Sequence, residues 1–160
     1  MWMMWALLQA AGVWSPPAQA AWTGPAPAGE VRLQAGALSM RSPAPLDVEI
    51  VSADDQVAIS PFLQAMRGIA FEVTDMSDRP ATPSEPILIP PPAPPVTREK
   101  LVEVTRSSPF RVKTRELAQN LFPAPGRYKI RAIVFLLDTY STPARRARMA
   151  SPPLVVQVAP

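Results

Sequence analysis

The stretch that decides the fold reads Pro125-Gly126-Arg127-Tyr128-Lys129-Ile130-Arg131-Ala132-Ile133-Val134-Phe135-Leu136-Leu137. Its side chains alternate in character, and two sets result. The apolar set, which faces one way, is Tyr128, Ile130, Ala132 and Val134; the basic set, which faces the other way, is Arg127, Lys129 and Arg131. This period of two predicts a strand with one buried and one solvated face. We therefore expect the longest strand of the protein over residues 127–137.

Shorter apolar runs lie on both sides of this strand, separated by clusters of the 22 prolines. Proline is poorly tolerated in helix interiors and in central strands, so these clusters mark the breaks between strands. The further predicted strands are 31–35, 46–50, 69–74, 87–89, 101–104, 110–113 and 154–158, with 31–35 the weakest and 87–89 an edge strand. The fold class is therefore predicted to be all-β. We expect one buried cluster that contains Tyr128, Ile130, Phe71 and Val73.

Residues 114–122 form the one mature segment with helical character, and Thr114 is a candidate N-cap. Three segments follow one another in a specific order. A short helical segment comes first, a Pro-Gly-x-Tyr sequence then opens a long strand, and a last apolar strand follows Ser151-Pro152. The run from Ile69 to Pro80, which ends in an Asp-x-Ser-Asp turn, adds to it. Over residues 46–158 this order resembles the small exported immunoglobulin-like domains of bacteria.

The resemblance implies an antiparallel β-sandwich of about seven strands, with one short helical turn before the Tyr128 strand. It also implies that the Tyr128 hydroxyl bonds back to the preceding corner. The chain has no cysteine, so it lacks the Cys-Trp-Cys core of antibody domains. No functional residue is carried over, because such domains share a scaffold and not a site.

The first 20 residues are apolar and end in Ala18-Gln19-Ala20, the small-x-small pattern of a signal-peptidase site. They predict a signal peptide over 1–20 and a periplasmic or secreted protein. No basic residue precedes Arg32, so an uncleaved membrane anchor and a disordered leader remain alternatives, and only the anchor would make the membrane a partner. The remaining chain divides into a Pro/Ala-rich leader with a candidate first strand at 21–45 and one domain at 46–160, which carries a Pro-rich insert at 80–95.

Several chemistries are excluded by the composition, because the chain contains neither cysteine nor histidine. No Ser-His or Cys-His nucleophile and no imidazole metal ligand is available. The six glycines form no phosphate-binding fingerprint, so we predict no cofactor and no metal site. Aspartates in predicted turns leave a calcium site or a glycosidase pair open, although turn capping explains them more simply. They are Asp54, Asp55, Asp75 and Asp78.

Charge divides the mature chain into two parts. Residues 21–95 carry four basic and nine acidic side chains, a net of −5, and residues 96–160 carry twelve and four, a net of +8. If early and late strands are neighbours, the two signs form cross-strand pairs. We expect either Glu49 or Glu72 to oppose a base from the later half on an outer face. The candidate bases are Arg111, Lys113, Lys129 and Arg131.

The sharpest cluster of charge is Arg145, Arg146 and Arg148, close to an aromatic loop residue, Tyr140. These four are the candidate contacts for an unidentified protein partner; a solvated hairpin end or the outer face of a strand is the simpler explanation for the arginines. They lack the interleaved aromatics of a nucleic-acid site, so no nucleic acid is expected. The sequence thus predicts a non-catalytic exported binding or assembly module. The alternatives are a protease-inhibitor-like domain or, in another class, a carboxylate-based hydrolase or calcium-dependent enzyme.

Overall fold

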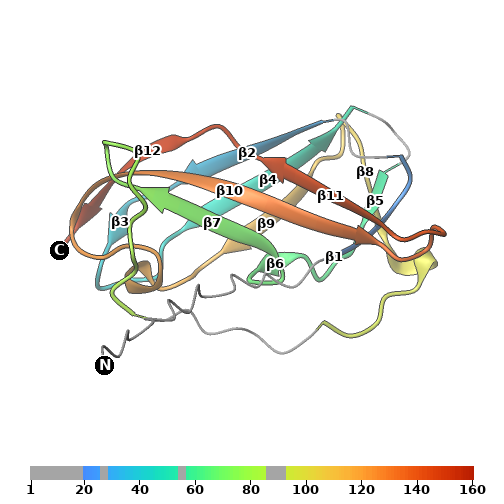
Figure 1. Ribbon diagram of the computed structural model, residues 1–160, viewed down its shortest axis with the longest axis horizontal. Coiled ribbons are helices and arrows are strands. Elements are labelled where there is room, and N and C mark those ends of the chain that lie inside the picture. Colours follow the sequence, from blue (N-terminus) through green and yellow to red (C-terminus); the bar gives the residue numbers. More distant parts are fainter. Residues whose placement is uncertain (1–19, 26–28, 54–56, 86–92) are drawn as a thin grey trace, which may run out of the picture.

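The computed structural model describes residues 20–25, 29–53, 57–85 and 93–160, and within them the protein is all-β. Two sheets lie face to face (Figure 1). In the larger sheet the strand order is β3 (Leu38–Ser39), β12 (Leu154–Ala159), β10 (Gly126–Asp138), β1 (Ala20–Thr23), β5 (Val57–Ile59) and β8 (Val102–Val104). Three further strands complete it: β11 (Arg145–Ala150) and β7 (Gly68–Thr74), which pair with β10, and β6 (Gln64–Ala65), which pairs with β7.

The smaller sheet has three antiparallel strands in the order β2 (Gly29–Ala35), β4 (Leu46–Ser52) and β9 (Phe110–Thr114). The expectation of about seven antiparallel strands is not confirmed, because the described residues form sheets of nine and three strands. Parallel pairs also occur, between β1 and β10, β12 and β3, and β6 and β7. The additional strands are mostly short, and sequences of two to four residues contain too few alternations to be recognised.

β10 is the longest strand, as its sequence predicts, and it organises the larger sheet (Figure 1). One side of it pairs with β12 over Gly126–Ile130 and then with β11 over Ile133–Asp138. On its other side it pairs with β7 and, near its end, with β1. β10 therefore pairs with four other strands and sets their register.

The core lies between the sheets in two clusters. The first joins side chains of both sheets, including Trp22, Ile50, Ile69 and Val134. The second contains Tyr128, Ile130 and Val73 together with Phe122, whose ring centroid lies 5.2 Å from that of Tyr128. Phe71 is half-buried and packs against both clusters, so the expectation of one buried cluster is confirmed for Tyr128, Ile130 and Val73 and is wrong for the burial of Phe71.

The corner before β10 has the expected helical turn, but in a reduced form. Only Ala118–Asn120 forms a helix, a single 3-10 turn called η2, and Leu117 precedes it instead of Thr114, which ends β9. Pro123 and Pro125 follow it closely and leave little room for a longer helix. The Tyr128 hydroxyl donates a hydrogen bond to the carbonyl oxygen of Ala124, 3.0 Å away, which confirms that this tyrosine bonds back to the corner.

The segment expected to be a leader contributes strands to both sheets. β1 begins at Ala20 and buries Trp22, and β2 pairs with β4 along all seven of its residues. Cleavage after Ala20 would therefore leave Ala21 and Trp22 in β1. Another 3-10 turn, η1 (Arg98–Lys100), precedes β8. The predicted strand at 87–89 lies outside the described residues, and none of the helices within them is long and apolar enough to span a bilayer.

Candidate interaction surface

The three arginines of the basic cluster lie on β11, but they do not point the same way. Arg145 is turned toward the sheet, where its Nε donates to Asp138 Oδ2 at 3.0 Å and its guanidinium lies 4.8 Å from the centre of the Trp22 ring. It also donates to the carbonyl oxygen of Gly24. Arg145 therefore fixes the β10–β11 connection to β1.

Asp138, the partner of Arg145, is a fully buried carboxylate at the end of β10. Its Oδ1 accepts the backbone N–H groups of Tyr140 and Ser141 at 3.0 and 3.1 Å, and its Oδ2 accepts the Ser141 hydroxyl at 2.6 Å. Burial raises the pKa of this carboxyl, but the bonds from Ser141, Arg145 and Tyr140 outweigh burial and hold the pKa below its ordinary value. A charged Asp138 thus organises the whole loop that follows it.

Tyr140 belongs to this organised loop. Its N–H is bonded to Asp138, and its hydroxyl donates to the carbonyl oxygen of Val96, which anchors the segment that leads into η1. Of the four candidate contacts, Tyr140 and Arg145 are therefore bonded within the β10–β11 connection and its surroundings.

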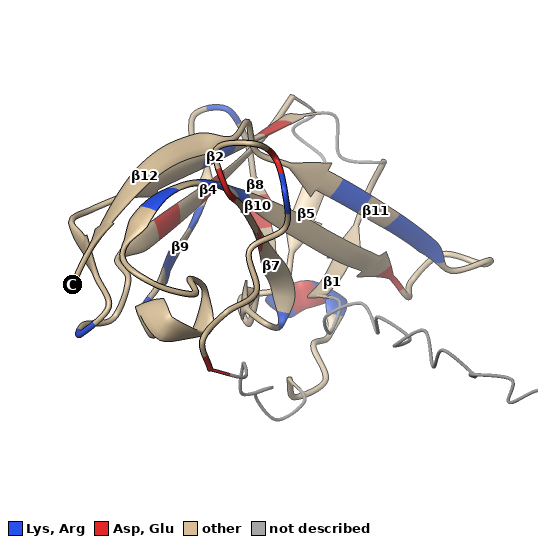
Figure 2. Ribbon diagram, turned by 60° about the vertical axis from the view of Figure 1, so that its left-hand side comes forward, with Lys and Arg blue, Asp and Glu red and all other residues tan. Residues whose placement is uncertain are grey.

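Arg146 and Arg148 alternate with Arg145 and project from the opposite, exposed face of β11. Basic residues occupy much of this strand (Figure 2). Arg148 donates to Glu72 on β7 at 3.2 Å, and Arg131 on β10 contacts the same carboxylate. Arg146 is exposed and has no hydrogen-bond or ion-pair partner among the described residues. Arg131 and Arg148 thus share one carboxylate while Arg146 has none, and these four side chains together carry a net charge of 3 − 1 = +2.

The backbone of β11 has an open edge, because β10 is the one strand that pairs with it among the described residues. Just beyond β11, the Ser151 N–H donates to the Ala132 carbonyl at 2.9 Å, in the same register as the β10–β11 pairs. Residues of an antiparallel pair direct their N–H and C=O groups alternately toward and away from the partner. Arg146, Arg148 and Ala150 therefore direct their backbone groups away from β10.

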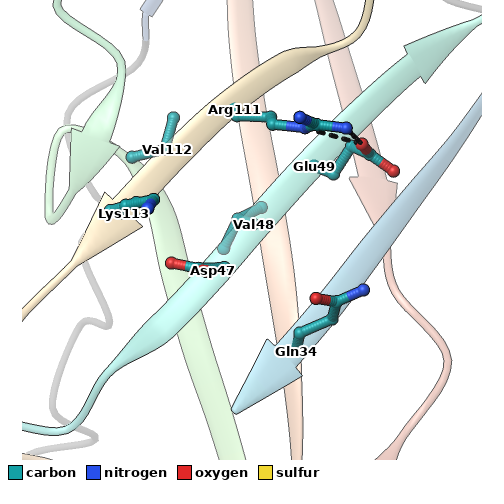
Figure 3. Close-up of a pocket in the computed structure, with 7 residues that line it drawn as sticks. All are labelled: Gln34, Asp47, Val48, Glu49, Arg111, Val112 and Lys113. Carbon is teal, nitrogen blue, oxygen red and sulfur yellow. Dashed lines mark hydrogen bonds and ion pairs between the residues drawn. The ribbon is translucent and has the colours of Figure 1, made fainter. Parts of the chain in front are cut away.

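A second polar surface lies on the outer face of the smaller sheet. A shallow hollow of about 330 Å³ crosses its three strands, lined by Gln34 of β2, Asp47 and Glu49 of β4, and Arg111 and Lys113 of β9 (Figure 3). The centre of this face is a cross-strand row in which Glu49 accepts from Arg111 at 2.9 Å and from Arg32 at 3.0 Å. The bond from Arg111, and then that from Arg32, hold the pKa of Glu49 below its ordinary value against the effect of burial. The acidic and basic side chains of this face therefore largely neutralise each other.

The aspartates considered for catalysis or calcium do not form a described site. Asp75 Oδ1 accepts the N–H groups of Ser77 and Arg79 at 2.8 and 3.0 Å, and Asp78 pairs with Lys129 at 2.7 Å. Asp54 and Asp55 lie outside the described residues. Within the described part of the chain, no three acidic side chains gather closely enough to hold a metal ion. Asp75 caps a turn, and Asp78 fixes that turn to β10.

Comparisons with protein families, with curated proteins and with solved structures found no match for this chain. The surface must therefore be interpreted from its own chemistry.

The sequence indicated the arginines of this surface and offered a strand face as one explanation for them, but β11 was not among the predicted strands. β11 reads Arg-Arg-Ala-Arg-Met-Ala, with no β-branched or aromatic residue, so it has a low strand propensity. The pattern that could have predicted this strand is an alternation of two kinds of residue. Ala147 and Met149 take its half-buried positions, and Arg146 and Arg148 take its exposed positions. The run is only six residues long, and pairing with β10 supplies what its composition lacks.

Proposed function

We propose that the protein is a non-catalytic, exported binding or assembly module that acts through protein–protein contacts. The observation that carries the proposal is the β11 surface, where an open strand edge and the unpaired Arg146 lie together. A strand edge offers a row of unused hydrogen-bonding groups, and natural proteins either protect such edges or use them to bind partners. The module would bind a partner there.

The interior of the β10–β11 connection supports this proposal, because it is built for rigidity. Asp138, Arg145 and Tyr140 join β10, β11, β1 and the segment at Val96 through bonds between buried or half-buried groups. A rigid support holds an adjacent binding surface in one geometry and reduces the entropy lost on association. Asp138, Arg145 and Tyr140 are thus the support, and Arg146 and Arg148 are the contact residues.

We further propose that the scaffold is immunoglobulin-like. Two features support this: the two sheets that face each other across a common core, and the hydrogen bond from Tyr128 to the corner before β10. The strand number and the parallel pairs depart from the usual pattern, so the relation concerns the central strands β4, β7, β10 and β12. Export follows from the predicted signal peptide at 1–20 and would deliver the module to the periplasm or the medium.

Recovery of the exported protein under native conditions tests the proposed function. Native mass spectrometry should find a complex with a second protein in a fixed ratio. A protein that is always a monomer would contradict the proposal, and turnover of a glycoside by that monomer would support the carboxylate-based hydrolase instead.

A further inference from the structure

The open edge of β11 has a specific chemical character, which identifies the kind of partner that fits it. The edge spans Arg145–Ala150, and its outward backbone groups belong to Arg146, Arg148 and Ala150. A strand added there would form main-chain hydrogen bonds with these three residues. Its side chains would stand alternately beside the exposed arginines and beside the half-buried Ala147 and Met149.

Charge then selects the residues of the added strand. Positions beside Arg146 and Arg148 face a surface with a net charge of +2, since Glu72 is the one carboxylate that Arg131 and Arg148 share. Opposite charges in directly opposed cross-strand positions stabilise a sheet, and like charges destabilise it. The positions on the inner side adjoin Ala147 and Met149, which pack against the core, and so suit small apolar residues.

A second copy of this chain is a poor occupant of the same edge. In an antiparallel pair of two β11 strands, the outward backbone groups of residues 146, 148 and 150 would have to bond with each other. Of the three registers that join more than one of these residues from each strand, two place an arginine opposite another arginine, and the third pairs Arg148 with Ala150 in both directions and joins only two residues of each strand. The arginines therefore disfavour most pairings of two copies while they attract an acidic strand.

We propose that β11 binds an extended acidic segment of a partner protein, with acidic and small apolar residues in alternation, as an additional strand of the larger sheet. This inference rests on the proposed function and specifies its binding mode. Main-chain hydrogen bonds would supply affinity, and the two outward arginines would supply selectivity for acidic residues. Arg145 and Asp138 would hold the edge in place without touching the partner.

The test uses the full-length exported protein and three synthetic peptides. The first alternates Glu and Val over eight residues, the second has Lys in place of each Glu, and the third is the Glu-Val peptide with its bonding-side amides N-methylated. The first peptide should slow amide exchange of Arg146, Arg148 and Ala150, and both others should bind at least about tenfold more weakly. N-methylation removes the strand hydrogen bonds and leaves the charge, so this peptide separates strand addition from attraction alone.

Two exposed variants complete the design. Arg146→Glu should weaken binding of the Glu-Val peptide about tenfold, whereas Arg127→Glu, which changes an exposed arginine at the far end of β10, should leave it within about twofold. The inference is overturned if the Glu-Val peptide fails to bind, if the N-methylated peptide binds equally well, or if protection appears on another strand. Recovery of a stable complex with a protein bound elsewhere would overturn this inference and the placement of the partner at β11, and would leave the binding-module function standing.

Discussion

Glu49 of β4 lies directly opposite Arg111 of β9, and the Arg111 Nε donates to a Glu49 carboxylate oxygen across 2.9 Å. The two residues are 62 positions apart in the sequence and come from the acidic and the basic part of the chain. Glu72 of β7 is related in the same way to Arg131 of β10. Both pairs confirm that the charge division reflects neighbouring strands.

Reversal of one charge should test this pairing. Glu72→Lys would remove the shared partner of Arg131 and Arg148 and place three like charges together. We expect the free energy of unfolding to fall by about 1 kcal/mol, because exposed pairs contribute little each. Added salt should shrink the difference in a urea titration.

Glu103→Lys on β8 is the matched control, since Glu103 is exposed and has no ion-pair partner among the described residues. Equal effects of the two substitutions would mean that net charge, and not cross-strand pairing, sets the stability.

The packing of the core predicts that alanine substitutions of two phenylalanines lower the free energy of unfolding by different amounts. Phe122 is fully buried against Tyr128, so Phe122→Ala should cost about 3–5 kcal/mol. Phe71 is half-buried, so Phe71→Ala should cost clearly less, although both changes remove the same atoms. Thermal and urea unfolding of the two variants measures the order, and a larger loss at Phe71 would contradict the described packing.

Asp138 should make the free energy of unfolding depend on pH in the acidic range. The pKa of its carboxyl in the folded protein lies below the ordinary 3.8, so the folded state binds fewer protons than the unfolded state as the pH falls. Its contribution is therefore complete above about pH 4 to 5 and is lost as the pH falls through the lower pKa of the folded state.

Asp138→Asn removes this titration while it keeps the size of the side chain. Wild-type protein should lose more unfolding free energy than the variant between pH 6 and about pH 3, as measured by urea titration at each pH. Parallel curves for the two proteins would show that Asp138 is not the charged group that organises the loop.

Processing of the N-terminus is a separate prediction. Intact mass of the exported protein should give a mature chain that begins at Ala21, after the Ala18-Gln19-Ala20 motif. That chain would keep the pairing of Trp22 with Ile59 and lose that of Ala20 with Leu136. Full-length protein in the membrane fraction would establish an uncleaved anchor instead.

The long strands were predictable because each contains several repeats of the alternation between apolar and polar residues. The expected strands at 46–50, 69–74 and 127–137 correspond to β4, β7 and β10, and each carries apolar residues on the face that the core requires. β5 and β6 were missed, because two or three residues contain no measurable period. Their positions are set by pairing with distant strands.

The candidate contacts show a similar limit. Sequence reasoning brought Tyr140, Arg145, Arg146 and Arg148 together, yet it had no means to separate support from contact. Alternation along β11 turns Arg145 inward to Asp138 and turns Arg146 and Arg148 outward. Asp138 has the appearance of an ordinary strand-end residue in the sequence, and its role follows from a buried geometry that no local pattern shows.

The central claim is that the protein is a module that binds a partner at the β11 surface, and one comparison tests it most directly. The complex recovered from the exporting compartment is re-formed from wild-type protein, the Arg146→Glu/Arg148→Glu double variant and Arg127→Glu, and each Kd is measured. We predict that the double variant binds at least about tenfold more weakly and that Arg127→Glu binds within about twofold of wild type. Equal affinity of all three proteins, or no partner at all for the wild type, would contradict the account.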